Sequence, residues 1–114
     1  KIIVDKNIKI FDSLSYLDFL KLMKNAKVIF TDSGGIQEES TVLKIPCYTL
    51  RENTERPITI SQGTNRLISP NRESIIKSFN NYGFNINSDY NLPKGWDGKA
   101  SERIVKFLDK IIRR

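Results

Sequence analysis

The organisation of this chain follows from residues 31–39, which read Thr31-Asp32-Ser33-Gly34-Gly35-Ile36-Gln37-Glu38-Glu39. The apolar run 26–30 precedes them, and an amphipathic segment ending near Leu43 follows. This order predicts a strand, a glycine turn and a helix. A helix that begins at adjacent glycines directs free backbone N–H groups and the positive end of its dipole at whatever lies in front, which favours a phosphate.

The residue types at this turn suggest particular ligand contacts. Gly34 and Gly35 carry no Cβ, so an anion can approach their backbone closely, although a tight turn without a ligand also explains them. Ser33 is a candidate for the same anion or for the helix cap, and the two roles are compatible. Glu39 follows Gly35 by four residues and shares its helix face about 6 Å further along the axis, where a carboxylate can accept hydrogen bonds from ribose hydroxyls. We interpret the stretch as half of a nucleotide site.

Further motifs follow in the chain. They are the strand pattern of residues 44–50, Arg51-Glu52-Asn53-Thr54-Glu55-Arg56-Pro57, Gly63-Thr64-Asn65-Arg66-Leu67 and residues 96–104, Trp-Asp-Gly-Lys-Ala-Ser-Glu-Arg-Ile. Together with residues 31–39 they resemble the C-terminal half of the non-hydrolysing UDP-N-acetylglucosamine 2-epimerases. That family reads Asp-Ser-Gly-Gly-x-Gln-Glu-Glu, Arg-x-x-Thr-Glu-Arg-Pro and Gly-Thr-Asn in this order. The resemblance covers residues 11–103, with Gly95-Trp96 in place of the usual aromatic-Gly order.

The resemblance implies a UDP site with named contacts. Glu39 takes the position of the ribose-binding acid, and Arg56 that of an arginine that contacts the diphosphate. Phe19 and the backbone of Leu14 correspond to positions that meet the uracil. Ser33, Gly34 and Gly35 complete the implied set at the phosphates.

Ordinary packing offers alternatives for two of these contacts. Arg56 precedes a proline, which biases it toward extended backbone, but it could also form a loop ion pair with Glu52 or Glu55. Leu14 and Phe19 have the spacing of a hydrophobic staple around a helix capped by Ser15.

The family's reaction inverts C2 of the sugar by eliminating UDP and adding it back on the other face, giving UDP-N-acetylmannosamine. The family's acid–base carboxylates belong to another domain, and its histidine to the start of this one, whereas this chain contains no His. We therefore expect no catalytic residue, no cofactor and no metal ligand here. A hydrolysing epimerase, a UDP-sugar glycosyltransferase of the same fold and a non-catalytic nucleotide-binding module remain open alternatives.

Composition sets further bounds. At 114 residues and 39% hydrophobic, residues 1–114 make one small domain without an internal boundary, and a chain that opens at Lys1 looks N-terminally truncated. The net charge is +6, but the basic residues are scattered, so we expect no nucleic-acid partner; no apolar run is long enough for a membrane span. The single Cys47 lies in an apolar strand, which fits a buried thiol in a cytoplasmic protein. The resemblance further implies UDP or UDP-N-acetylglucosamine as ligand and a homodimer.

Strands and helices are predicted to alternate. We expect strands at 9–11, 27–31, 46–50 and 65–68, with a possible earlier one at 2–4, and helices at 16–25, 35–43, 57–63, from Ser69-Pro70 to a stop at Gly83, and 98–112, with a polar loop over 84–97. This pattern predicts an α/β fold with a parallel sheet covered by helices. The resemblance specifies it as a partial Rossmann-like sheet, the latter part of the C-terminal domain of a glycosyltransferase-B-like two-domain enzyme. Such an incomplete sheet should expose a strand edge and apolar helix faces.

Overall fold

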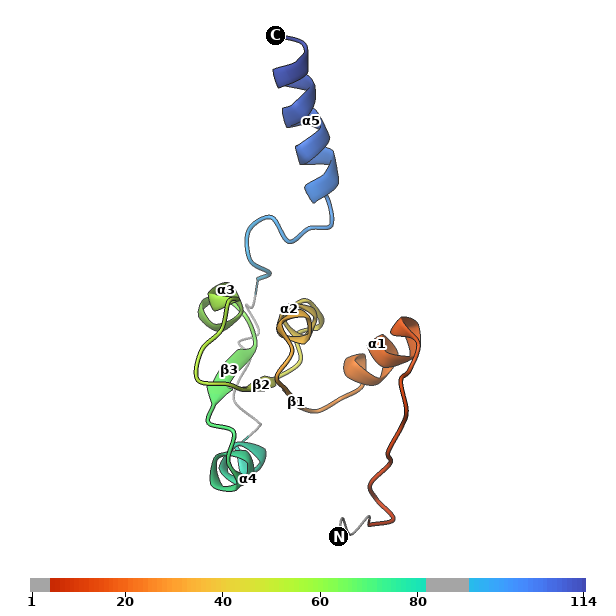
Figure 1. The fold of residues 1–114 in the computed structure, drawn as a ribbon, viewed down its shortest axis with the longest axis vertical. Helices are drawn as coiled ribbons and strands as arrows, with labels where there is room; N and C mark the ends of the chain where they lie inside the picture. Colours follow the sequence, from red (N-terminus) through yellow and green to blue (C-terminus); the bar gives the residue numbers. More distant parts are fainter. Residues whose placement is uncertain (1–4, 82–90) are drawn as a thin grey trace.

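The computed structural model describes residues 5–81 and 91–114 (Figure 1). Its elements, in chain order, are α1 (Tyr16–Lys24), β1 (Ile29–Thr31), α2 (Gly34–Leu43), β2 (Cys47–Leu50), α3 (Pro57–Ser61), β3 (Asn65–Ile68), α4 (Arg72–Asn80) and α5 (Ala100–Ile112). The predicted alternation is confirmed from residue 16 onward.

The three strands form one parallel sheet in the order β1-β2-β3. Phe30 pairs with Tyr48, and Cys47 with Asn65, in the ladder register. Helices α2 and α3 cover one face, α4 lies on the other, and α1 lies beyond β1 (Figure 1). The α/β class is therefore confirmed, and β1 has an open edge within the described part of the chain.

Two of the sequence-based predictions are wrong, one of a strand and one of the start of a helix. Residues 9–11 form no strand, because no described strand lies alongside to pair with them. Helix α4 begins at Arg72, where the Asn71 side chain accepts a hydrogen bond from the Ser74 N–H, rather than at Ser69-Pro70. The possible strand at 2–4, the stop at Gly83 and residues 84–90 of the loop predicted at 84–97 lie outside the described residues.

Helix α1 begins as predicted. The Ser15 hydroxyl accepts from the backbone N–H of Asp18 at 3.3 Å and donates to the Asp18 carboxylate at 2.7 Å. Asp18 also lies in the first turn, where its negative charge suits the helix dipole. The hydrophobic staple between Leu14 and Phe19 stays a prediction.

The interior between α2, α3 and the sheet is mainly polar. Among the described residues, the buried hydrophobic side chains are Met23, Cys47 and Tyr48, whereas the largest fully buried ones are Gln37 and Asn65. The predicted burial of the Cys47 thiol is confirmed, and this burial raises its pKa. On the opposite face, the Phe30 and Tyr48 rings stack with centroids 5.3 Å apart.

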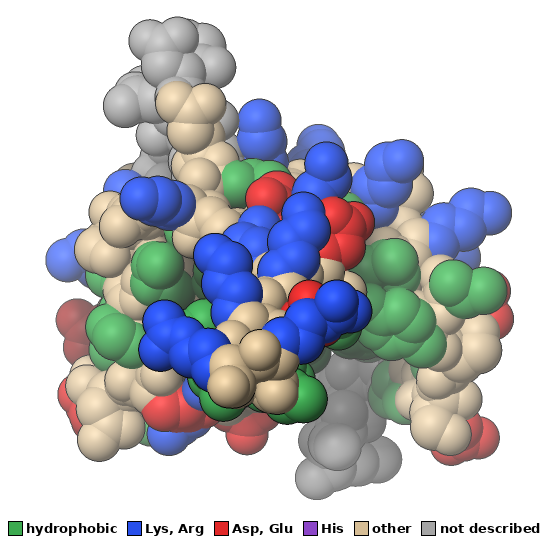
Figure 2. All heavy atoms as spheres, turned by 90° about the horizontal axis from the view of Figure 1, so that it is seen from above, with side chains coloured by type: hydrophobic (Ala, Val, Ile, Leu, Met, Phe, Trp, Pro, Cys, Tyr) green, Lys and Arg blue, Asp and Glu red, His purple; other side chains and the backbone are tan. Residues whose placement is uncertain are grey.

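Helix α5 projects away from the sheet, and none of its residues is buried (Figure 1). Its apolar side chains Ile104, Phe107 and Ile111 are each more than half exposed. Seen from the end that α5 occupies, Lys and Arg side chains gather over the middle of the surface with hydrophobic side chains around them (Figure 2). The expectation of exposed apolar helix faces is confirmed.

Gly63 provides a test of packing between α3 and α2. A Cβ at this position would collide with the Thr59 carbonyl oxygen and would lie 2.5 Å from Thr41 Oγ1. We expect Gly63→Ala to lower the free energy of unfolding by about 1–3 kcal/mol, measured by urea denaturation. Gly35→Ala is the control, because the nearest atom to its Cβ is 4.0 Å away; equal stability of the two variants would contradict the prediction.

Candidate functional site

The N-terminus of α2 opens at the carboxyl end of β1. Thr31 Oγ1 accepts a hydrogen bond from the Ser33 N–H at 3.1 Å, which fixes the turn between strand and helix. Ser33 occupies the N-cap position in extended conformation, but its hydroxyl makes no capping hydrogen bond. The capping role considered for this side chain is therefore not observed, so it leaves the N–H groups of the first turn to another acceptor.

The two glycines differ in their surroundings. A Cβ on Gly34 would lie 2.6 Å from Glu55 Oε1, the end of a flexible side chain, whereas the space beside Gly35 is open. The Glu55 side chain can move away from a Cβ at Gly34, and at Gly35 a ligand can approach the helix backbone without obstruction.

The neighbouring Glu55 carboxylate is held in its charged form. A hydrogen bond from its own backbone N–H is the largest influence that lowers its pKa, and Arg51 lowers it further. Arg51 Nη1 lies 2.9 Å from Glu55 Oε2. The negative Glu55 carboxylate and the positive Arg51 guanidinium therefore lie near the first turn of α2.

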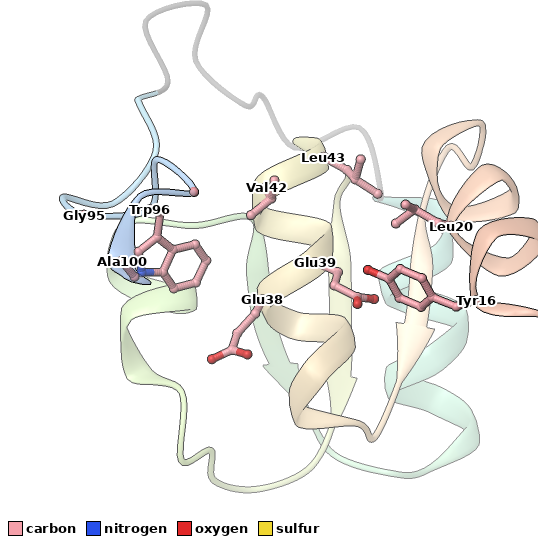
Figure 3. Close-up of a pocket in the computed structure, with 10 residues that line it drawn as sticks. Tyr16, Leu20, Glu38, Glu39, Val42, Leu43, Gly95, Trp96 and Ala100 are labelled. Atoms are coloured by element: carbon pink, nitrogen blue, oxygen red, sulfur yellow. The ribbon is translucent and has the colours of Figure 1, made fainter. Parts of the chain in front are cut away.

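Glu39 lies on the face of α2 that meets α1. A hydrogen bond with the Glu39 carboxylate and its negative charge raise the pKa of the Tyr16 phenol. Figure 3 shows the Tyr16 hydroxyl directed at Glu39. The predicted ribose acceptor therefore faces the Tyr16 phenol, a neighbour that sequence reasoning did not predict.

Arg56 lies in the loop that joins β2 to α3 and is the N-cap residue of that helix, with φ −120° and ψ 56°. Its Nε lies 2.8 Å from Glu38 Oε1, and both side chains are about 40% exposed. The N–H at Nε is buried and not aligned for a hydrogen bond, so this contact is a charge pair. Arg56 forms an ion pair with neither Glu52 nor Glu55, although its charge helps to lower the pKa of Glu55, because the loop folds back over α2 and brings Arg56 to Glu38.

A pocket of about 620 Å³ lies between α1, α2 and the segment leading into α5 (Figure 3). Tyr16 and Trp96 flank the face of α2 that carries Glu38, Glu39 and Val42. The turn that bears Trp96 is fixed from α5, since Arg103 donates to both Asp97 carboxylate oxygens and to the Gly95 carbonyl. Of the predicted UDP contacts, the pocket includes Glu39.

The remaining predicted contacts lie at different points around α1 and α2. Leu14 and Phe19, at the start of α1, are each 37% exposed. They do not line the pocket. The structure thus brings Ser33, Gly34 and Gly35 together through α2, and joins Arg56 to that helix through Glu38.

Sequence reasoning missed the buried polar cluster behind the site. Gln37 Oε1 accepts hydrogen bonds from Thr54 Oγ1 at 2.6 Å and from Asn65 Nδ2 at 3.0 Å. Asn65 Nδ2 also donates to Thr59 Oγ1. Polar residues at core positions of α2 and β3 were the signal that could have indicated this cluster, because a buried amide needs partners.

The described residues contain no group of three or more side chains suited to holding a metal ion. Among the helices in the described part of the chain, none combines the length and hydrophobicity that a bilayer crossing requires.

A parallel sheet with a glycine-rich helix start and a helix carboxylate at one edge defines a Rossmann-like α/β protein. The sequence model of the UDP-N-acetylglucosamine 2-epimerases matches residues 1–109. The chain therefore belongs to the UDP-N-acetylglucosamine 2-epimerase family.

Comparison with individual relatives supports the same family. The chain is 49% identical to the UDP-N-acetylglucosamine 2-epimerase of Methanocaldococcus jannaschii over 104 residues, which are 91% of this chain and 28% of the relative. The Escherichia coli K12 enzyme of the same name is 39% identical over 90% of this chain and 28% of its own length. This chain thus spans little more than a quarter of these relatives.

Solved structures match as well. The Methanocaldococcus jannaschii enzyme in complex with UDP-GlcNAc and UDP superposes with a TM-score of 0.80 at 48% identity, covering 93% of this chain and 29% of that one. The Neisseria meningitidis UDP-GlcNAc 2-epimerase bound to UDP-GlcNAc gives a TM-score of 0.64 at 37% identity, covering 88% of this chain and 28% of that one. These neighbours confirm the predicted fold and family.

The open space beside Gly35 generates a prediction. Gly35 is the second residue of α2, a helical position that Val can adopt, so Gly35→Val should fold while its side chain fills the space in front of the helix start. We expect UDP binding, measured by calorimetry, to weaken at least tenfold with a melting temperature close to that of the parent. Loss of folding with full binding by the folded remainder would instead indicate a turn glycine without a ligand.

Proposed function

We propose that this chain is the UDP-binding part of an enzyme that epimerises UDP-N-acetylglucosamine at C2 to UDP-N-acetylmannosamine, through elimination and re-addition of UDP. The observation that supports this most strongly is the likeness over 93% of the chain to an enzyme solved with UDP-GlcNAc and UDP. The activity concerns a protein of the relatives' length, of which this chain represents about 28%.

The described residues offer a distinct partner for each part of the nucleotide. The backbone N–H groups at Gly34 and Gly35, with the Ser33 hydroxyl, receive the diphosphate at the positive end of α2. Arg56 supplies a guanidinium from the facing loop, and Glu39 accepts from the ribose hydroxyls. Leu14 and Phe19, at the start of α1, receive the uracil.

This arrangement serves the departure of UDP. Negative charge builds up on the diphosphate as the bond from C1 to oxygen breaks, and donors that are already oriented stabilise it without reorganisation. Proton removal and return at C2 require an acid–base group. We assign those groups to portions of the enzyme outside this chain, which has no His.

The hydrolysing epimerase would use the same UDP contacts, since it also breaks the bond to UDP. A glycosyltransferase is not favoured, because the family match extends over residues 1–109. We further propose a cytoplasmic location, which a single buried free thiol supports. Assembly as a homodimer stays a prediction.

The proposed contact between Arg56 and the diphosphate can be tested directly. In the complete protein that carries this chain, Arg56→Ala removes charge-assisted hydrogen bonds worth about 1.5–3 kcal/mol, so UDP affinity should fall roughly 10- to 150-fold by calorimetry. Arg72→Ala, which removes an exposed arginine at the start of α4, is the matched control and should leave affinity unchanged. Unchanged UDP binding by Arg56→Ala would refute the diphosphate contact.

Because we assign the acid–base groups to portions of the enzyme outside this chain, we expect that residues 1–114 alone do not epimerise the substrate. Deuterium incorporation at C2 of UDP-N-acetylglucosamine in deuterated water is a sensitive readout, because it detects proton exchange even without net conversion. We expect no incorporation above the protein-free rate. Exchange at a rate comparable to the complete enzyme would place the acid–base groups within this chain.

A further inference from the structure

We propose that Gln37 and Asn65 are positioning residues for Arg56, and that they act through the hydroxyl groups of Thr54 and Thr59. The inference rests on the proposed function, because it takes Arg56 as the diphosphate contact. It adds a cause for the position of that arginine beyond its place as the N-cap residue of α3.

The first connection reaches the Arg56 N–H. Thr54 Oγ1 accepts a hydrogen bond from this N–H at 2.9 Å. The same hydroxyl donates to Gln37 Oε1 at 2.6 Å. A hydroxyl can donate one hydrogen bond while it accepts another, so Thr54 links the loop backbone to a side chain of α2.

The second connection reaches the Arg56 carbonyl. Thr59 Oγ1 donates to this oxygen at 2.7 Å, and the Thr59 N–H donates to it at 3.0 Å. Thr59 Oγ1 in turn accepts from Asn65 Nδ2 at 3.1 Å. Both polar groups of the Arg56 peptide backbone are thus bonded to threonines that bond to the buried amides.

The two amides are bonded to one another, which joins the two connections, while Gln37 Nε2 is buried without a hydrogen-bond partner. Asn65 Nδ2 donates to Gln37 Oε1 at 3.0 Å, and Thr49 Oγ1 donates to Asn65 Oδ1 at 2.6 Å. Gln37, Asn65, Thr49 and Thr59 are at most 2% exposed. Such bonds are strong where water is excluded, and a broken one leaves an unpaired buried group, so the network favours a single arrangement of the loop.

The network also fixes the position of the Arg56 backbone relative to the proposed phosphate site. Gln37 and Glu38 belong to the helix whose first turn includes Gly34 and Gly35. Gln37 fixes the Arg56 backbone through Thr54, while Glu38 holds Arg56 Nε at 2.8 Å. One rigid helix therefore carries both the anion-binding backbone and the residues that hold the arginine, which lowers the entropy cost of binding.

The test compares two Thr→Val substitutions of the same shape in the complete protein. Thr54→Val removes the hydroxyl that joins Arg56 to Gln37. Thr64→Val is the matched control, because the Thr64 hydroxyl is buried but has no hydrogen-bond partner. We expect Thr54→Val to weaken UDP binding about threefold to tenfold, and Thr64→Val and Thr54→Ser to leave it unchanged.

Uridine distinguishes positioning from a general structural defect, because it lacks the diphosphate. Thr54→Val should bind uridine with parental affinity, and in the Arg56→Ala background it should cause no further loss of UDP affinity. Equal weakening of UDP and uridine, or UDP binding equal to that of Thr64→Val, would overturn the inference. If Thr54→Val does not fold, Thr59→Val tests the second connection with the same criteria.

These outcomes are separable from failure of the proposed function. Weakened UDP binding by Arg56→Ala together with parental binding by Thr54→Val would retain the diphosphate contact and refute the positioning network. Parental UDP binding by Arg56→Ala would refute both.

Discussion

The buried carboxamide of Gln37 is the constraint on which the site depends. Its oxygen accepts from the loop that follows β2 and from Asn65 on β3, so a single group ties α2 to two segments that follow it in the chain. A buried amide must find partners or cost free energy, and its partners must therefore return to the same positions on folding. The hydrophobic effect alone would not specify this, because apolar contacts tolerate sliding.

The interior of the protein is mainly polar, whereas part of its surface is apolar. Three short strands and their helices enclose few apolar side chains, and Ile104, Phe107 and Ile111 of α5, which projects away from them, are exposed. Small and polar residues such as Ser40 and Thr41 let α2 lie close to the sheet, and their hydroxyls are satisfied by the Gln37 carbonyl one turn earlier. Specific hydrogen bonds therefore define the site side of the sheet more than apolar volume does.

Charges near the first turn of α2 occur in opposite-sign pairs. Arg51 pairs with Glu55, and Arg56 with Glu38, at the end of the helix that is already positive. Because these side chains are partly exposed, each pair contributes little to stability. In the second pair, the Glu38 carboxylate orients the Arg56 guanidinium that is proposed to contact the diphosphate.

The sequence by itself determined the α/β alternation and the helix start at Ser33, Gly34 and Gly35, because hydrophobic periodicity and glycine turns are local properties. It determined the family through the resemblance of several motifs and their order along the chain. It failed at 9–11, since a strand requires a neighbour that local pattern cannot supply. Only the tertiary structure decided that Arg56 pairs with Glu38 and that Gln37 meets Asn65, 28 residues further along the chain. Such contacts depend on how the loop returns over the helix, which residue types at given spacings do not encode.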